Sequence, residues 1–239
     1  MIEMIVKKYP SEVVRIANPV DGIYTLELKS LSRRFKYSPG QFLHLALDSD
    51  YDGIGQWPES RCFSMQSNPD EEIIRITYSV KGAFTSQMRD QLQTGDKVWL
   101  KLPYGDLFQQ PHNKENVVFI AGGTGITPFL SLFTHLSFTS YHNPTIYLGF
   151  RNRAHHIYQR ELEKMKKLFQ SVDQEKQGIA VLTRFEDDGG RLDIDDIFSK
   201  HGSNSCYFIS GPPEMISSFK TSLINKGLPD NKIFTDDWE

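Results

Sequence analysis

Short segments of alternating apolar and polar residues, separated by turn-forming residues, fill the first hundred residues of the chain. Alternation with a period of two residues predicts strands that bury one face. Only residues 84–92 have the spacing of a helix. We expect strands at 12–16, 23–28, 41–47, 73–79 and 97–102. Several short strands of this kind indicate an antiparallel barrel that is closed or nearly closed.

The pattern changes at residue 116. Residues 117–121 are all apolar, which is typical of a strand buried on both faces. A glycine-rich turn follows, and after it the apolar residues recur at helical spacing. Those expected on the buried face of this helix are Phe129, Leu130, Leu132, Phe133 and Leu136.

Strand and helix patterns then alternate to the end of the chain. We expect strands at 145–150, 179–182, 206–209 and 232–234, and helices at 157–169, 194–198 and 213–225. This alternation predicts a parallel sheet with helices on both faces. A polar stretch at 109–116 separates the two patterns, so we expect two domains, residues 1–112 and 113–239.

The composition narrows the functional classes. Of the 239 residues, 38% are hydrophobic and 24% are charged, with a formal net charge of −3, which is typical of a globular chain. A pI near 6.2 without a basic run argues against nucleic acid as a partner. The apolar run 117–121 is far shorter than the roughly 20 residues of a membrane span. The first residues lack the pattern of a signal peptide, so the expected location is cytoplasmic.

The chain has only two cysteines, Cys62 and Cys206. They cannot form a disulfide framework, and they cannot supply the four thiolates of a cysteine-ligated iron–sulfur cluster. Any such cluster is therefore expected on another protein. The sequence contains no His-Glu-x-x-His and no Cys-x-x-Cys motif, so we predict no metal site.

The sequence GGTGITP at 122–128 lies where a buried strand passes into a helix. Backbone N–H groups and a helix N-terminus would converge there and could hold a pyrophosphate. Thr127 could cap the helix, with Pro128 at its first position. No Gly-Lys-Ser/Thr follows, which excludes a P-loop nucleoside triphosphatase. The alternative is a tight turn without a ligand.

A second candidate site begins at Arg61-Cys62-Phe63-Ser64. A charge, an aromatic ring and a hydroxyl on one strand can bind a flat, phosphorylated ligand. Some twenty residues later, the sequence GAFT at 82–85 opens the one predicted helix of the barrel and provides another anion-binding N-terminus. The alternative for the strand is an ordinary edge strand.

Taken together, these motifs resemble those of the ferredoxin–NADP⁺ reductase family of flavoprotein oxidoreductases. The resemblance covers nearly the whole chain and rests on five segments in the family's order: PGQF at 39–42, RCFS at 61–64, KGAFT at 81–85, GGTGITP at 122–128 and GPPEM at 211–215. It implies a two-domain fold, an FAD-binding antiparallel Greek-key β-barrel followed by an α/β nucleotide-binding domain with a parallel sheet.

The resemblance also implies roles in binding FAD. Arg61 would bind the FAD pyrophosphate, and Phe63 would stack on the flavin or its ribityl chain. Ser64 would form a hydrogen bond with N5 of the flavin. The remaining FAD-binding candidates are Cys62, Gly82, Phe84 and Thr85. Phe63 departs from the family's tyrosine and loses a phenolic hydrogen bond worth about 0.5–1.5 kcal/mol.

In the second domain, the resemblance implies that the GGTGITP turn at 122–128 binds the nucleotide phosphates. It also implies that the GPPEM motif at 211–215 lies near the nicotinamide. The implied nucleotide-binding residues are Gly123, Thr124, Gly125, Thr127, Gly211, Pro212 and Met215. Ser210 replaces the family's cysteine beside the nicotinamide. Ser64, Ser210 and Asp236 are the candidate catalytic residues, and Trp238 is a candidate gate over the flavin or else a surface-packed tail residue.

We expect the protein to use NADPH in preference to NADH, with NADH as the alternative. A 2′-phosphate requires cations, whereas a 2′-hydroxyl is usually recognised by an acid after the second strand. Here Arg151 follows that strand, Thr183-Arg184 resembles the family's Ser-Arg contact, and Arg191 is near in sequence. The alternative is that these arginines pair with the acids at 186–188.

The expected function is an FAD enzyme that takes a hydride from NADPH and passes single electrons to a separate carrier, an iron–sulfur or flavin protein such as ferredoxin or flavodoxin. Members of the family with their own ferredoxin domain are excluded by length and cysteine count. The alternatives are an NADH-dependent reductase component of an oxygenase, a flavin or ferric reductase, and a non-enzymatic nucleotide-binding subunit. The sequence leaves the oligomeric state open.

Overall fold

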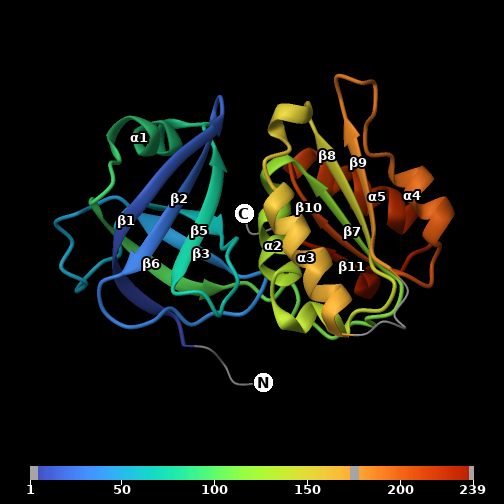
Figure 1. The fold of residues 1–239 in the computed structure, drawn as a ribbon, viewed down its shortest axis with the longest axis horizontal. Coiled ribbons are helices and arrows are strands. Elements are labelled where there is room, and N and C mark those ends of the chain that lie inside the picture. Colours follow the sequence, from blue (N-terminus) through green and yellow to red (C-terminus); the bar gives the residue numbers. More distant parts are fainter. Residues whose placement is uncertain (1–4, 173–177, 237–239) are drawn as a thin grey trace. The chain divides into compact units, whose positions relative to one another are not determined.

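The computed structural model describes residues 5–172 and 178–236 (Figure 1). The chain divides into two compact units, Met1–Asp106 and Leu107–Glu239. The division comes earlier than the expected boundary after residue 112. Leu107 is buried in the core of the second unit, Phe108 packs against that core, and His112 contacts the rings of Phe208 and Phe234. Polar residues flank these side chains in the sequence, so the apolar pattern does not predict that they are buried.

The first unit is an antiparallel sheet with the strand order β4-β3-β6-β1-β2-β5. Its strands are β1 (Lys7–Val20), β2 (Ile23–Ser30), β3 (Phe42–Ala46), β4 (Ser60–Ser64), β5 (Ile73–Ser79) and β6 (Lys97–Tyr104). Just beyond β4, the N–H of Gln66 donates to the carbonyl of Arg75 in β5 over 2.8 Å. This bond joins the two outer strands, so the predicted barrel is confirmed.

Inward-facing apolar side chains fill the barrel. Fully buried side chains come from strands β1, β2, β3, β5 and β6: Val13, Leu26, Leu28, Leu43, Leu45, Ile74, Ile76, Val98 and Leu100. Strand β1 is much longer than the predicted 12–16. Its register against β2 shifts between Val13 and Arg15 and again between Ala17 and Val20. Such bulges interrupt the alternation that the sequence prediction relies on. Helix α1 (Ala83–Gln91) buries Phe84 and Met88 against this core.

The second unit is a parallel sheet with the strand order β11-β10-β7-β8-β9. Its strands are β7 (Val117–Gly122), β8 (Thr145–Phe150), β9 (Ala180–Phe185), β10 (Cys206–Ser210) and β11 (Ile233–Thr235). Because β8 and β10 lie on opposite sides of β7, the strand order reverses at the carboxyl ends of β7 and β10. In open α/β sheets, ligands bind at such a reversal.

Helices cover both faces of this sheet, as predicted. Helices α2 (Thr127–Phe133) and α3 (Gln159–Val172) pack on one face, and α4 (Ile194–His201) and α5 (Pro213–Asn225) pack on the other (Figure 1). The expectation for Leu136 was wrong. Helix α2 ends at Phe133 and a 3₁₀ turn follows, whose Ser137 N–H donates to the His135 ring, so Leu136 is 61% exposed.

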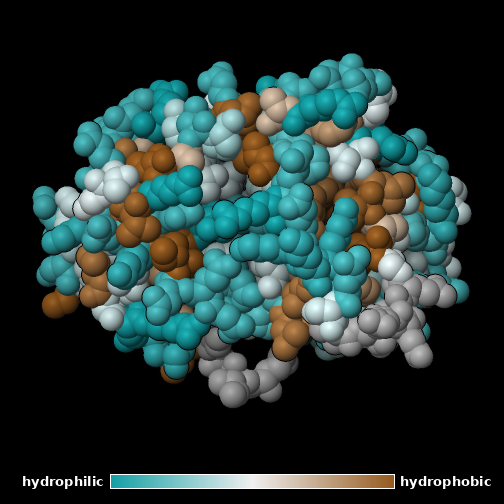
Figure 2. Space-filling view, in the orientation of Figure 1, coloured by the Kyte–Doolittle hydropathy of each residue, from teal (hydrophilic) through white to brown (hydrophobic). Residues whose placement is uncertain are grey.

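The surface in Figure 2 is mostly hydrophilic, with separate apolar patches. The large apolar side chains exposed on the described residues come from several segments: Ile5, Val6, Leu31, Ile54, Leu136 and Ile224. Scattered apolar residues of this kind are normal for a folded domain. In the described parts of the chain, no helix combines the length and the apolar character that a membrane span requires.

Candidate functional site

The two predicted FAD-binding motifs of the first unit are in contact. Arg61 in β4 is largely exposed, and its guanidinium lies over the ring of Phe84 in α1, 5.1 Å from the ring centre. It also donates to the Ser60 carbonyl over 2.8 Å and to Glu59 over 2.9 Å. The barrel therefore places a cation beside the first turn of α1, as an anion-binding site requires.

The loop before α1 is shaped by the hydroxyl of Thr85. This oxygen accepts hydrogen bonds from the N–H groups of Lys81 over 2.9 Å and Gly82 over 3.1 Å. It also lies 3.1 Å from the Gly82 carbonyl, to which it can donate. The hydroxyl of Thr85, one of the FAD-binding candidates, thus organises the loop itself. The N–H groups of the first helical turn remain available to an anion, because a helix has no internal partner for them.

The next residues of β4 lie at the edge of the buried core. Phe63 is 8% exposed, and its ring meets that of Tyr78 in a T-shaped contact with centres 5.8 Å apart. Ser64 is equally buried and pairs with Phe42 of β3. Cys62 points to the opposite face of the strand, with Sγ 3.5 Å from Nε2 of His44. The structure therefore groups Arg61 with Phe63 and separates Cys62 from them.

A buried network of polar side chains fixes the seam between β4 and β5. The Thr77 hydroxyl donates to Gln66 Oε1 over 2.6 Å, and the Tyr37 hydroxyl donates to the Ser67 carbonyl over 3.1 Å. The backbone N–H of Arg75 donates to the Ser67 hydroxyl over 3.0 Å. Satisfied buried networks make a region rigid. This network lies just beyond Ser64 in the chain, and no sequence pattern pointed to its residues.

In the second unit, the glycine-rich segment forms a 3₁₀ turn, Gly123–Ile126, between β7 and α2. Gly123 has a φ of +56° with open space around its Cβ position, so only the backbone conformation demands glycine there. The predicted cap is displaced by one residue. Ile126 is the N-cap, Thr127 is the first helical residue, and the Thr127 hydroxyl donates back to the Thr124 carbonyl over 2.9 Å.

Gly125 packs directly on the backbone of the loop after β10. A Cβ at this position would lie 2.4 Å from Cα of Gly211 and 2.7 Å from the carbonyl carbon of Ser210. A Cβ on Gly122 would lie 2.9 Å from the sulfur of Met215. The GGTGITP and GPPEM motifs therefore interlock at the carboxyl ends of β7 and β10, where the strand order reverses.

Two of the candidate catalytic residues meet behind this turn. Ser210 is 1% exposed, and its hydroxyl donates to Oδ2 of Asp236 over 3.1 Å. The backbone N–H of Asp236 donates to the Ile209 carbonyl over 3.0 Å, which fixes the carboxylate beside the end of β10. Trp238, the candidate gate, lies outside the described residues.

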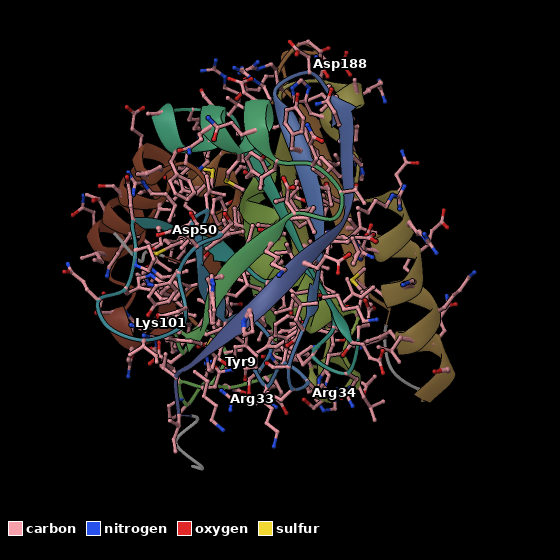
Figure 3. All side chains as sticks on the ribbon, turned by 90° about the vertical axis from the view of Figure 1, so that its left-hand side faces the viewer. Tyr9, Arg33, Arg34, Asp50, Lys101 and Asp188 are labelled. Carbon is pink, nitrogen blue, oxygen red and sulfur yellow. The ribbon has the colours of Figure 1, made fainter. Side chains whose placement is uncertain are left out.

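Several arginines lie at the carboxyl ends of β8 and β9. Arg153, near the end of β8, forms an ion pair with Asp188 at 2.9 Å and lies over the ring of Phe185, so one of the acids at 186–188 is paired with an arginine (Figure 3, Asp188 labelled). Arg184 and Arg191 form no ion pair with any residue that the structure describes. A Cβ on Gly190 would lie 3.4 Å from Cδ of Arg184.

The turn after β9 thus brings the side chain of Arg184 close to Gly190, the residue that precedes Arg191. Arg151, which follows β8, is also exposed and lies outside any ion pair among the described residues, and Thr183 is half-buried in β9. The structure therefore leaves cations uncommitted at the edge of the sheet where the adenosine end of a dinucleotide is expected.

Two exposed arginines between β2 and β3, Arg33 and Arg34, form local contacts. The guanidinium of Arg33 lies 5.1 Å from the ring centre of Tyr9, and Arg34 donates to the Asp70 carbonyl (Figure 3, with Tyr9, Arg33 and Arg34 labelled). Within residues 5–172 and 178–236, no group of three or more potential metal-ligating side chains is arranged to hold a metal ion.

The known proteins that resemble this chain include oxidoreductases and reductase components of oxygenases. The profile of the oxidoreductase NAD-binding domain family matches residues 119–221. The reductase component of propane 2-monooxygenase from Mycolicibacterium goodii is 27% identical over 243 residues, covering 95% of this chain and 66% of that protein. The reductase component of phenol 2-monooxygenase from Pseudomonas sp. (strain CF600) is 30% identical over 240 residues, covering 94% and 63%.

A crystal structure of a ferredoxin NADP⁺ reductase from Neisseria gonorrhoeae, with bound FAD and NADP, has a similar fold. Its TM-score is 0.76 at 15% identity, and the match covers 96% of this chain and 98% of that chain. By contrast, this chain spans about two thirds of the length of the curated oxygenase reductases that it matches.

Proposed function

We propose that this chain, which has the two-domain fold of a ferredoxin–NADP⁺ reductase, belongs to that flavoprotein family, uses FAD to take a hydride from NADPH and passes single electrons to a separate redox protein. The observation that carries the proposal is the interlocked turn of the second unit. Gly125 packs on Gly211, which brings two helix N-termini and a reversal of strand order to one edge of the sheet. That arrangement binds a dinucleotide diphosphate.

The residues of the first unit fit FAD. Arg61 and the first turn of α1 offer a guanidinium and unpaired N–H groups to a diphosphate, because their contact brings both motifs together. Ser64, which lies in β4 just before the seam between β4 and β5, would donate to the edge of the flavin ring. When bound, the flavin accepts a hydride from the reduced nucleotide and releases two electrons one at a time. The protein contributes orientation, which is the main demand of a direct transfer.

The residues of the second unit orient the nucleotide. The turn at Gly123–Ile126 would offer its backbone N–H groups to the phosphates, and the close approach of Gly125 to Gly211 keeps the turn from shifting. The Ser210 hydroxyl donates its hydrogen bond to Asp236, so the lone pairs of its oxygen are left for a ligand donor. The buried serine is thereby fixed in one rotamer beside the proposed nicotinamide position.

We further propose that Arg184 and Arg191 select NADPH through its 2′-phosphate. Both are uncommitted in the described structure, and they come from the two arms of one turn, whereas Arg153 is neutralised by Asp188. The test is kcat/KM for NADPH and NADH in the wild-type protein and in Arg184→Ala, Arg191→Ala and the control Arg160→Ala on α3. Loss of one charge-assisted contact predicts about a tenfold fall for NADPH alone.

Equal kcat/KM values for the two nucleotides in the wild-type protein would overturn the NADPH preference. So would equal effects of Arg184→Ala on both nucleotides, since NADH has no 2′-phosphate. The control should leave both values unchanged, because Arg160 is exposed on α3 and is not one of the proposed contacts to the 2′-phosphate.

For the electron acceptor, the oxygenase reductases among the relatives favour an oxygenase or its ferredoxin. They also favour a second candidate, an NADH-dependent reductase component of an oxygenase. Anaerobic reduction by NADPH, followed by stopped-flow mixing with ferredoxin, flavodoxin, free flavin and ferric iron, separates these acceptors. Purified protein without flavin absorbance bands after addition of FAD would instead support the nucleotide-binding subunit.

A further inference from the structure

Tyr78 is a buried residue whose hydroxyl has no hydrogen-bond partner among the described residues. It lies in β5, is 4% exposed and belongs to the barrel core. A buried phenol without a partner loses its hydrogen bonds to water without replacement, which costs free energy. Hydroxyl groups left in this condition are rare in native structures, and each calls for a physical explanation.

Two ring contacts place Tyr78 beside the proposed FAD site. The ring of Phe63 in β4 lies 5.8 Å away in a T-shaped contact, and the ring of Tyr24 in β2 stacks at 5.8 Å. The hydrogen bond from Gln66 to Arg75 brings the two strands together, so Tyr78 lies across the seam from the RCFS motif. Phe63 is the position where the family has a tyrosine, and the phenol missing from β4 is thus present one strand away.

The chemistry of Tyr78 suits a hydrogen-bond donor. Burial raises the pKa of its phenol well above the ordinary value, so the proton stays on the oxygen at every physiological pH. Arg89 of α1 interacts electrostatically with Tyr78, while its guanidinium is bound by Asp90 at 2.6 Å. The hydroxyl is therefore a neutral donor without a partner, beside the strand that is proposed to hold the flavin.

We propose that Tyr78 is a flavin-binding residue whose hydroxyl donates a hydrogen bond to an oxygen of FAD and replaces the phenol that Phe63 lacks. The inference rests on the proposed function, since it presupposes that FAD binds the first unit. It predicts that binding of FAD satisfies a group that the free protein leaves unsatisfied. The hydroxyl of Tyr78 then lowers the stability of the free protein and raises the stability of the FAD complex.

The test is Tyr78→Phe, which removes only the hydroxyl oxygen. For the apoprotein, we expect a urea midpoint equal to or above that of the wild type, because an unsatisfied buried group is removed. For FAD, measured by quenching of flavin fluorescence on binding, we expect Kd to rise about tenfold, which corresponds to about 1.4 kcal/mol. Adding Phe63→Tyr to this variant should restore much of the affinity, since it returns the phenol to the family's position.

Tyr158→Phe is the matched control. The hydroxyl of Tyr158 is also buried without a partner among the described residues, but it belongs to the core of the second unit. This substitution should raise or preserve the urea midpoint and leave the Kd for FAD unchanged. Comparison of the two variants separates the removal of a buried hydroxyl from the loss of a flavin contact.

Wild-type affinity for FAD in Tyr78→Phe would overturn the inference and leave the proposed function intact. A lower urea midpoint of the Tyr78→Phe apoprotein would also overturn it, because the hydroxyl would then have a partner in the free protein. Failure of the wild-type protein to bind FAD at all would contradict the proposed function itself.

Discussion

The strongest quantitative prediction concerns Gly125, where the fold permits no side chain. In Gly125→Ala, the new Cβ would lie 2.4 Å from Cα and 2.5 Å from N of Gly211, and both are backbone atoms. Carbon atoms in contact are normally about 3.5–4.0 Å apart. The two loops must therefore separate by about 1 Å, although Ser210 and Ala121 are paired in adjacent strands just before them.

The magnitude follows from what must move. Overpacking against side chains typically costs about 1–3 kcal/mol, and a rigid backbone places this case at the upper end of that range or beyond it. Gly123→Ala meets no neighbour within 4 Å but requires a φ of +56°, at a cost of about 1–2 kcal/mol. Gly82→Ala has an extended φ of −162° and open space, so its effect should stay within about 0.5 kcal/mol.

The assay combines urea unfolding, followed by far-ultraviolet circular dichroism, with calorimetric titration of NADP⁺. We expect destabilisation to increase in the order Gly82→Ala, Gly123→Ala, Gly125→Ala, and we expect Gly125→Ala to weaken nucleotide binding by more than about tenfold. If Gly125→Ala were as stable as Gly82→Ala and bound NADP⁺ like the wild type, the proposed interlock of the two motifs would be refuted.

Two further predictions concern buried polar groups. Burial lowers the pKa of His44, His112, His156 and His201 below 6.5, so below about pH 6.5 the unfolded chain binds more protons and stability should fall as the pH falls toward the native values. His112→Gln, which can still accept from Tyr141, should flatten that decline in urea titrations between pH 7 and 5, and an unchanged slope would contradict the assignment. Ser210→Ala removes the donor to Asp236 and should cost about 1–3 kcal/mol and slow flavin reduction in stopped-flow measurements, with Ser210→Cys less affected; wild-type stability and rate in Ser210→Ala would show that the bond is dispensable.

Local patterns predicted most of the elements, because each depends on neighbours in the sequence. The apolar run that forms β7 and the helical spacing of α5 required no knowledge of distant residues. Boundaries were less predictable. The bulges of β1, the early end of α2 and the burial of Leu107 each depend on packing against segments far along the chain.

The hydroxyl groups at the candidate sites illustrate the same limit. Thr85 and Thr127 are the residue types that bind phosphate, yet both hydroxyls bond the backbone of their own loops. Their short side chains can reach either partner, and the loop conformation decides between them. The site roles drawn from the family resemblance stay predictions, whereas the two-domain fold that it implied is confirmed.

Periodicity and turn residues act over a few positions, so they were enough to predict the barrel, the parallel sheet and the order of the five motifs. Which of these motifs touch depends on the tertiary structure. The contact of Arg61 with Phe84 joins residues of β4 and α1, and the interlock of Gly125 with Gly211 joins segments separated by several helices and strands. The tertiary structure also left the hydroxyl of Tyr78 without a partner beside Phe63, because hydrogen bonding in a core depends on every strand around it.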